Sequence, residues 1–176
     1  LTGGPVRFAP HVVDNRVYVG SDDGLIYCLD RERGQLIWKR RLGPSDRLIP
    51  GNGRMISPWP VRTGLVAAQG IVYATRGLFP REGCWAVALN ARDGSEVWRT
   101  KVNASPQGYL LLSSRALFIP TGRGTPFALV RDSGTALGAF GGPGGAYALV
   151  AGGTLVSGRG NKGELSVSDT FGRDQL

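Results

Sequence analysis

Histidine and cysteine, two side chains that often act as nucleophiles, bases and zinc ligands, are scarce in this chain of 176 residues. His11 is the only histidine, so a Ser-His-Asp or Cys-His catalytic system would need it, and a site with several histidine ligands cannot form within the chain. Because His11 follows Pro10 at the start of an expected strand, we expect it to line a channel or to pack. Cys28 and Cys84 form neither an adjacent pair nor a Cys-x-x-Cys pair, and we expect two free thiols, with Cys28 buried.

Four aspartates stand where a metal ligand or a base could stand, but each falls in a stretch that is typical of a tight turn. They are Asp22, Asp23, Asp30 and Asp93. Aspartate is common in such turns because its side chain accepts hydrogen bonds from the backbone two residues on. We therefore expect turn stabilisation from them, and no complete catalytic constellation is visible in the chain.

The stretch "GRGNKG", from Gly158 to Gly163, fits the Gly-x-Gly-x-x-Gly spacing of a dinucleotide site. That motif must open a helix after a strand, whereas here the alternating run "ELSVSDT" follows. We expect a hairpin loop at this position, and a plain connection between repeats at "GGPGG", residues 141–145.

The elements that would position these residues are repeated along the chain. "CLDRERGQLIW" ends at Trp38 and "ALNARDGSEVW" ends at Trp98, sixty residues later, with the same internal spacing. Around the first copy, four short segments of strand character, 9–13, 16–20, 25–29 and 35–39, are separated by Asn, Asp and Gly turns. A third copy places Phe118 where the others have Tyr18 and Tyr73, and Gly138 where they have a Trp.

Units of about 40 residues with four strands each predict an all-β chain of four-stranded antiparallel β-propeller blades. We expect blade 1 at about 6–41, an inserted loop at about 43–60, blade 2 at about 61–102, blade 3 at about 107–140 and a truncated blade 4 at about 145–176. The Gly turns the chain between the third and fourth strands, a small residue keeps one face of the sheet close to its neighbour, and the Trp covers the gap between blades. The chain opens at Leu1 in mid-pattern and stops one residue before a fourth Trp would fall, so we expect a piece of a longer protein.

At these residues the chain resembles the pyrroloquinoline-quinone (PQQ) repeat propellers, whose docking motif reads Ala-x-Asp-x-x-Thr-Gly-x-x-x-Trp. The matching positions are Cys28, Asp30, Gly34 and Trp38 in blade 1, and Ala88, Asn90, Gly94 and Trp98 in blade 2. The resemblance implies that these residues are structural. It also implies a ring of seven or eight blades, of which this chain supplies about four.

The resemblance leaves the function open, because a fold does not determine a function. Some members are alcohol or sugar dehydrogenases with PQQ and a metal ion on the axis, some resemble the cofactor-free scaffold lipoprotein BamB, and others are ligand-binding domains. The adjacent-cysteine disulfide of the alcohol-oxidising branch is absent here. We expect a binding or scaffold module without a cofactor in this piece; the alternative is part of a PQQ-dependent dehydrogenase whose catalytic residues, PQQ and calcium lie mostly in blades outside it.

The clearest departure from the repeat is the insertion "GPSDRLIPGNGRMISPWP", residues 43–60, which carries Trp59 between Arg and Met residues. Loops that elaborate a rigid scaffold often carry binding function. We expect an exposed Trp59 that contacts a protein partner or a small ligand, although a plain long connection would explain the length equally well. Arg7 and Arg62, aligned at the starts of blades 1 and 2, are expected to place positive charge near the axis, and His11 completes this candidate surface.

The net charge of +8 raises the question of a nucleic-acid partner. The basic residues are scattered, and the densest run, Lys39 to Arg41, ends a predicted strand without an aromatic platform, as solvated edge strands often do. We therefore rank a polyanion binder last. No run is long and apolar enough for a spanning helix, and an extracytoplasmic location, periplasmic or secreted, is implied by the resemblance alone.

Overall fold

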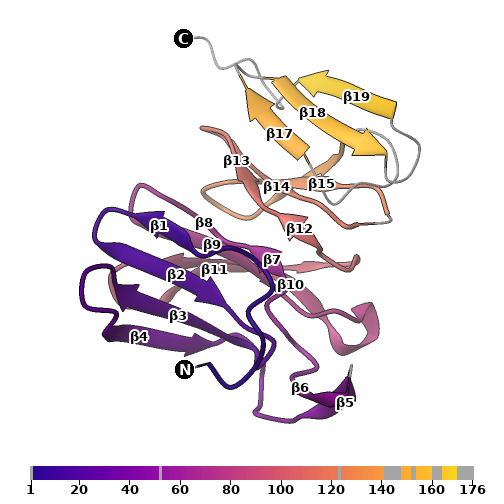
Figure 1. The fold of residues 1–176 in the computed structure, drawn as a ribbon. Helices are drawn as coiled ribbons and strands as arrows, with labels where there is room; N and C mark the ends of the chain where they lie inside the picture. The colour runs from indigo at the N-terminus through magenta and orange to yellow at the C-terminus, as the bar shows by residue number, and fades with distance from the viewer. Residues whose placement is uncertain are drawn as a thin grey trace. The chain divides into compact units, whose positions relative to one another are not determined.

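In the residues that it describes, the computed structural model has β-strands and one short 3-10 helix, and the chain divides into two compact units, residues 1–105 and 106–176 (Figure 1). It describes residues 2–51, 53–122, 124–140, 148–151, 154–159 and 164–169. Within these ranges no helix is both long and apolar enough to cross a membrane.

Unit 1 contains blades 1 and 2 and the insertion between them. Its elements are β1 (His11–Val13), β2 (Arg16–Gly20), β3 (Leu25–Asp30), β4 (Leu36–Arg41), β5 (Ile49–Gly51), β6 (Arg54–Ile56), β7 (Thr63–Gly64), β8 (Val66–Ala68), β9 (Ile71–Arg76), η1 (Pro80–Glu82), β10 (Cys84–Asn90) and β11 (Glu96–Val102). Strands β1 to β4 form one antiparallel sheet in chain order, and β8 to β11 form a second.

Unit 2 contains blade 3 and the described part of blade 4. Its strands are β12 (Gly108–Tyr109), β13 (Leu111–Leu112), β14 (Ala116–Ile119), β15 (Phe127–Val130), β16 (Ala136–Ala139), β17 (Ala148–Ala151), β18 (Thr154–Arg159) and β19 (Glu164–Asp169). Strands β13 to β16 form a four-stranded antiparallel sheet, and β17 to β19 form a three-stranded one. Strands β18 and β19 pair antiparallel, and β18 includes Gly158 and Arg159 of "GRGNKG". The loop expected at the rest of that stretch, residues 160–163, and the connection expected at 141–145 lie outside the described residues.

The internal repeat is confirmed by the register of the sheets. Tyr18 pairs with Cys28, which pairs with Trp38. The second and third sheets repeat these pairings with Tyr73, Ala88 and Trp98, and with Phe118, Ala128 and Gly138. Each third strand also has a register shift directly after the small residue, which is Cys28, Ala88 or Ala128. The three small residues are fully buried, as the motif predicts.

The turn after each third strand needs its glycine. The backbone φ angles of Gly34, Gly94 and Gly134 are 65°, 72° and 70°. Residues other than glycine adopt such positive φ angles only with strain. The N–H of each glycine donates to the carbonyl four residues earlier, at 2.8 to 2.9 Å. Asp30 accepts hydrogen bonds from the backbone N–H groups of Glu32 and Arg33 in the first of these turns, as an Asx turn requires.

Trp38 joins blade 1 to blade 2. Its Nε1–H donates to the carbonyl of Ala91 at 3.0 Å, and its indole lies on the backbone of Gly94, so close that a Cβ on Gly94 would be 2.7 Å from Cε3. The same carbonyl accepts hydrogen bonds from Arg16 Nη1 at 2.8 Å and from the Tyr18 hydroxyl at 3.4 Å. The motif Gly of blade 2 is thus both a turn residue and the platform for the Trp of blade 1.

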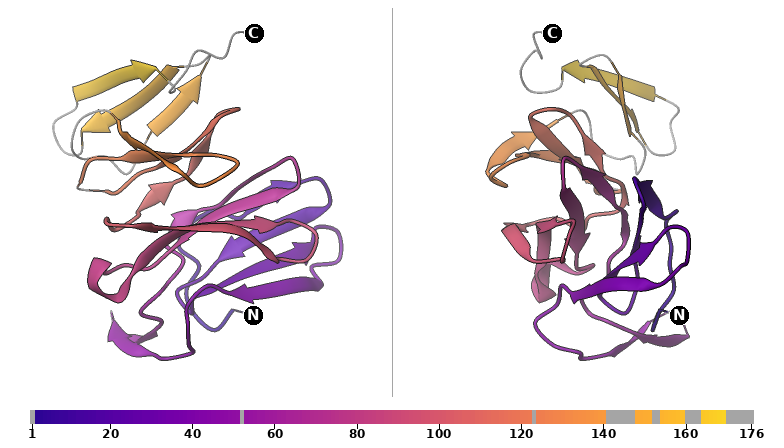
Figure 2. Two further views of the ribbon diagram at one scale, coloured as in Figure 1. Left: turned by 180° about the vertical axis from the view of Figure 1, so that it is seen from behind. Right: turned by 90° about the vertical axis from the view of Figure 1, so that its left-hand side faces the viewer.

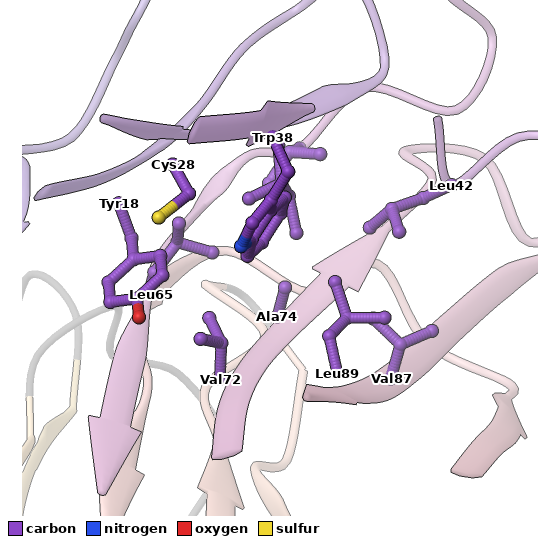
Figure 3. Packing of buried hydrophobic residues seen from close by; sticks show 11 residues of the cluster. Tyr18, Cys28, Trp38, Leu42, Leu65, Val72, Ala74, Val87 and Leu89 are labelled. Carbon is purple, nitrogen blue, oxygen red and sulfur yellow. The ribbon is translucent and has the colours of Figure 1, made fainter. Parts of the chain in front are cut away.

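The core of unit 1 lies between these two sheets (Figure 3). Trp38 and Tyr18 stand beside one another on blade 1, with ring centroids 6.0 Å apart and planes tilted by 45°. Their apolar partners on blade 2 include Val72, Ala74, Val87 and Leu89. Burial of such aromatic and branched side chains contributes on the order of 1.5–3 kcal/mol each.

In blade 3 a different aromatic residue makes the contact that Trp makes in blades 1 and 2. In blade 2, Tyr73 and Trp98 repeat the tilted contact of blade 1, with centroids 6.0 Å apart. In blade 3, where Gly138 replaces the Trp, Phe140 packs edge-on against Phe118 with centroids 5.1 Å apart. Phe140 is 5% exposed, so an aromatic side chain two residues further along the chain restores the contact.

Candidate binding surface

The additions to the repeat in unit 1 gather at one end of the two sheets. In an antiparallel sheet, alternate connections lie at the same end. The β2–β3 turn, the β4–β8 connection with its insertion and the β9–β10 loop therefore share an end, which we call the loop end. Figure 2 shows the insertion hairpin β5–β6 standing away from the sheets at this end. The β1–β2, β3–β4, β8–β9 and β10–β11 turns lie at the other end, called here the turn end.

The structure brings Arg7 and Arg62 together at the loop end, on the buried carboxylate of Asp22. Arg7 Nε and Nη2 both lie 2.7 Å from Oδ2 of Asp22. Arg62 is bidentate, with Nε 2.9 Å from Oδ1 and Nη2 3.0 Å from Oδ2. Asp22 was expected to be a turn residue only, so its role as the shared partner of both arginines was missed.

The β2–β3 turn that carries Asp22 also holds the chain on either side of it. The backbone N–H of Asp22 donates to Pro5, and its carbonyl accepts from Ser57. Gly24 O accepts from Leu42 N at 3.0 Å, and Ser21 O accepts from Val61 N at 3.1 Å. The N-terminal segment and both ends of the insertion are therefore fixed to the same turn.

The expectation of an exposed Trp59 is wrong, because this side chain is only 8% exposed. Its Nε1–H donates to the carbonyl of Glu82 in the β9–β10 loop at 2.6 Å, and its ring packs on Gly43. The guanidinium of Arg47 lies over the ring, 5.3 Å from the centroid, and forms an ion pair with the Glu82 carboxylate at 2.5 Å. Trp59 therefore anchors the insertion to blade 2.

Arg76 is a buried cation that no sequence motif singles out. It is 5% exposed, its Nη1 donates to the carbonyl of Leu42, and its Nε has no hydrogen-bond partner within the described residues. Its guanidinium lies over the ring of Trp85, 5.3 Å from the centroid. Burial, followed by the nearby charge of Arg99, lowers the pKa of Arg76. The side chain thus binds the residue directly before the insertion from the side of blade 2.

With its base fixed, the insertion exposes apolar side chains. Leu48 and Met55, before and within the hairpin, are 49% and 51% exposed, and Phe79 in the neighbouring β9–β10 loop is 46% exposed. Arg54 and Arg81 are exposed in the same two loops. The exposed part of the insertion is thus the hairpin and not the Trp.

His11, the fourth predicted member of the surface, lies at the start of β1, where it pairs with Tyr18. It is half-buried, and among the described residues no hydrogen bond or ion pair joins it to Arg7, Arg62 or Trp59. The predicted surface is therefore not continuous: Arg7 and Arg62 form a pair, Trp59 is a buried anchor, and His11 is separate from both.

Both thiols are buried and free, as expected. Burial raises the pKa of Cys84 from 9.0 to about 11 and also raises that of Cys28, which Arg16 partly offsets. Burial and a 2.6 Å hydrogen bond to Asp23 raise the pKa of Tyr27 to about 12. These groups stay protonated at neutral pH, which suits packing and not nucleophilic chemistry.

The buried carboxylates of the loop end have no oxygen to spare for a cofactor metal. Both oxygens of Asp22 bind arginine, and those of Asp23 accept from the N–H groups of Gly3 and Leu25 and from the Tyr27 hydroxyl. Across the described ranges, no three His, Cys, Asp or Glu residues cluster as metal ligands. The residues present in this part of the chain do not fit the calcium site of a quinoprotein.

The four-stranded repeat, its strand register and the packing of Trp38 on Gly94 can be compared with proteins of known family. The family model described as outer membrane protein assembly factor BamB matches residues 1–138 of the 176. This chain belongs to that family. The BamB-like chain is 32% identical over 93 residues to outer membrane protein assembly factor BamB of Salmonella typhimurium, a match that covers 53% of the chain and 21% of the relative. The matched part therefore spans about a fifth of the length of this curated relative.

Solved structures agree on the fold. BamB from Moraxella catarrhalis superposes with a TM-score of 0.65 and 18% identity, over 98% of the BamB-like chain and 52% of that protein. Quinohemoprotein alcohol dehydrogenase from Comamonas testosteroni superposes with a TM-score of 0.58 and 20% identity, over 78% of the chain and 21% of the enzyme. The chain is an all-β, PQQ-repeat module of partial propeller type, and the likeness to the enzyme reaches its fold alone.

Proposed function

We propose that this chain is a binding module of a larger protein, in which blades 1 and 2 form a rigid platform and the insertion presents the contact surface for a protein partner. The observation that carries the proposal is the fixation of the insertion at both ends and at Trp59. Because these contacts fix the base of the hairpin, little conformational freedom remains to be lost on binding, which favours affinity. The exposed contact residues are Leu48 and Met55, with Phe79 in the β9–β10 loop, to which Trp59 and Arg47 of the insertion bind at Glu82.

Membership of the BamB family supports a scaffold role. The relatives that bear this name are assembly factors of the outer membrane, and we infer that the parent of this chain works outside the cytoplasm, in the periplasm or as a secreted protein. Two buried free thiols are compatible with this location, because neither is exposed to oxidants. Fractionation of cells that produce the full-length protein would test the location: recovery in the cytoplasmic fraction would contradict it.

The contact surface is tested by site-specific photo-crosslinking in the full-length protein. A crosslinking residue at position 48 or 55 should give one discrete protein adduct, and the same residue at Val97, 52% exposed on β11, is the matched control. Leu48→Asp with Met55→Asp should abolish the adduct without lowering the melting temperature, since both side chains already face solvent. Equal adducts from all three positions, or an adduct that survives the double substitution, would overturn the proposed surface.

The alternative of a PQQ-dependent dehydrogenase is supported by the likeness in fold, but the oxygens of the two buried carboxylates at the loop end, Asp22 and Asp23, are already engaged by protein donors. Titration of the full-length protein with PQQ and calcium, followed by quinone absorbance and reduction of an artificial electron acceptor, separates the two functions. Saturable binding with turnover of alcohols or sugars would favour the enzyme. A polyanion binder, the third alternative, predicts affinity for nucleic acid that falls steeply with salt.

A further inference from the structure

The two arginines at the loop end have more positive charge than their shared partner neutralises. The side chain of Asp22 is completely buried, whereas those of Arg62 and Arg7 are 12% and 36% exposed. Two guanidinium groups thus face one carboxylate, which leaves a net charge of +1 on this cluster. The cluster opens toward solvent on the side of Arg7.

The nearest other carboxylate does not remove this surplus. Asp23 directs its oxygens to the N–H groups of Gly3 and Leu25 and to the hydroxyl of Tyr27, so it serves the N-terminal segment and β3. Among the described residues, only Asp22 forms an ion pair with Arg7 or Arg62. Neither Nη1 group has a hydrogen-bond partner among the described residues. That of Arg62 is not among the buried unpaired atoms, and the side chain of Arg7 is 36% exposed, so both arginines reach solvent.

Asp22 orients the guanidinium groups as well as attracting them. Nε and Nη2 of Arg62 bind both of its oxygens and those of Arg7 bind Oδ2, which fixes each guanidinium group and leaves the Nη1 donors on the far edges. The Asp22 backbone is itself held by Pro5 and Ser57. Fixed pairs of N–H donors with a positive charge match the geometry of a carboxylate or phosphate, and their order is established before binding.

We propose that the cluster of Arg7, Asp22 and Arg62 is a binding site for a small oxyanion, a phosphate or a carboxylate. The anion accepts hydrogen bonds from the free edges of the two guanidinium groups and neutralises the surplus charge, while Asp22 positions both arginines and does not touch the ligand. A purely structural ion cluster would need only one arginine for one aspartate. The site is separate from the β5–β6 hairpin, so its failure would leave the proposed protein contact unaffected.

The test is isothermal titration calorimetry of the full-length protein at low ionic strength, with sodium phosphate and sodium acetate as separate probes and sodium chloride as the reference salt. We expect saturable binding of one equivalent of at least one probe. The stronger probe identifies the oxyanion, because phosphate presents three charge-bearing oxygens and acetate presents two.

Arg7→Gln should weaken this binding by roughly tenfold, the loss expected for one charge-assisted hydrogen bond. The matched control is Arg31→Gln, which removes an exposed arginine in the β3–β4 turn at the turn end and should leave affinity unchanged. An unchanged thermal unfolding profile of Arg7→Gln shows that its fold is intact. Heat no larger than that of chloride, or equal weakening by both substitutions, would overturn the proposal.

Asp22→Asn gives a second measure that does not depend on Arg7. The neutral amide cannot hold two guanidinium groups in the same geometry, so a positioning role predicts weaker oxyanion binding even though the local charge rises by one. If binding instead strengthens in this variant, net charge and not the fixed geometry determines affinity, and the assignment of Asp22 as a positioning residue is wrong.

Discussion

The docking of Trp38 on Gly94 predicts that two equivalent glycines respond differently to the same substitution. Gly34 and Gly94 occupy the same position of the same turn, with φ angles of 65° and 72°. A Cβ on Gly34 meets no atom within 4 Å, whereas a Cβ on Gly94 falls 2.7 Å from Cε3 of Trp38 and 3.0 Å from Cδ2 and Cζ3. Gly34→Ala is therefore a matched control for Gly94→Ala.

The magnitudes follow from these contacts. An alanine in the left-handed region costs roughly 1–2 kcal/mol at either position, so this cost cancels in the comparison. Only Gly94→Ala must also displace the indole, and overpacking of this kind costs about 1–3 kcal/mol. Displacement also weakens the hydrogen bond from Trp38 Nε1 to Ala91, which contributes about 1 kcal/mol. We expect Gly94→Ala to lower the free energy of unfolding by about 2–3 kcal/mol more than Gly34→Ala does.

Urea unfolding followed by tryptophan fluorescence measures this difference. All four tryptophans, at positions 38, 59, 85 and 98, belong to unit 1, so the signal reports the unit that contains both glycines. In a Trp38→Ala background, which itself should cost about 3–5 kcal/mol, the two glycine substitutions should become equivalent. Equal costs of the two substitutions in the wild-type background would refute the docking argument.

Three further outcomes are expected at the loop end and in the core. Asp22→Ala should lower the free energy of unfolding by about 2–4 kcal/mol, because Arg7 and Arg62 lose the buried carboxylate that pairs with both, and a loss below the error of urea titration would contradict this. Trp59→Ala should cost about 3 kcal/mol and speed amide exchange in 43–60 but not in 31–34; unchanged exchange in the insertion would show that the indole does not anchor it. The free energy of unfolding should fall as pH rises above about 9, by up to about 1.4 kcal/mol per pH unit, because the Cys84 thiol has a pKa of about 11 in the folded protein and holds its proton more tightly than in the unfolded chain. Cys84→Ala should flatten this pH dependence between pH 9 and 10, and an unaltered profile would exclude Cys84 as its cause.

The repeat could be predicted from the sequence because its determinants are local. Each turn glycine, the small residue and the Trp lie within eleven residues of one another, and the pairing of Tyr18 with Cys28 and of Cys28 with Trp38 follows from two short turns. The strand limits differ from those predicted by one or two residues at most, as for β4, which begins at Leu36 and ends at Arg41. Periodicity and turn chemistry carry this information without any long-range contact.

The candidate site could be predicted only in part, because its contacts join distant segments. The alignment of Arg7 with Arg62 gave their shared location at the starts of two blades, but not Asp22 as their common partner, 15 and 40 residues away. Trp59 was misjudged because its hydrogen-bond acceptor is a carbonyl in the β9–β10 loop, and a backbone carbonyl leaves no signal in the sequence. Phe140 was also missed, since it takes the place of an absent Trp from two positions further along.

The β2–β3 turn holds both ends of the insertion, since Gly24 binds Leu42 and Ser21 binds Val61. The distance between the two attachment points is therefore set by one tight turn of blade 1 and does not depend on what lies between them. For protein engineering this makes the position a ready graft site: a foreign peptide could replace the β5–β6 hairpin between fixed stems, while the Trp38 contact at the opposite end keeps the angle between the blades. In evolution the same arrangement lets a new loop be acquired without a change in the packing of blade 1 on blade 2.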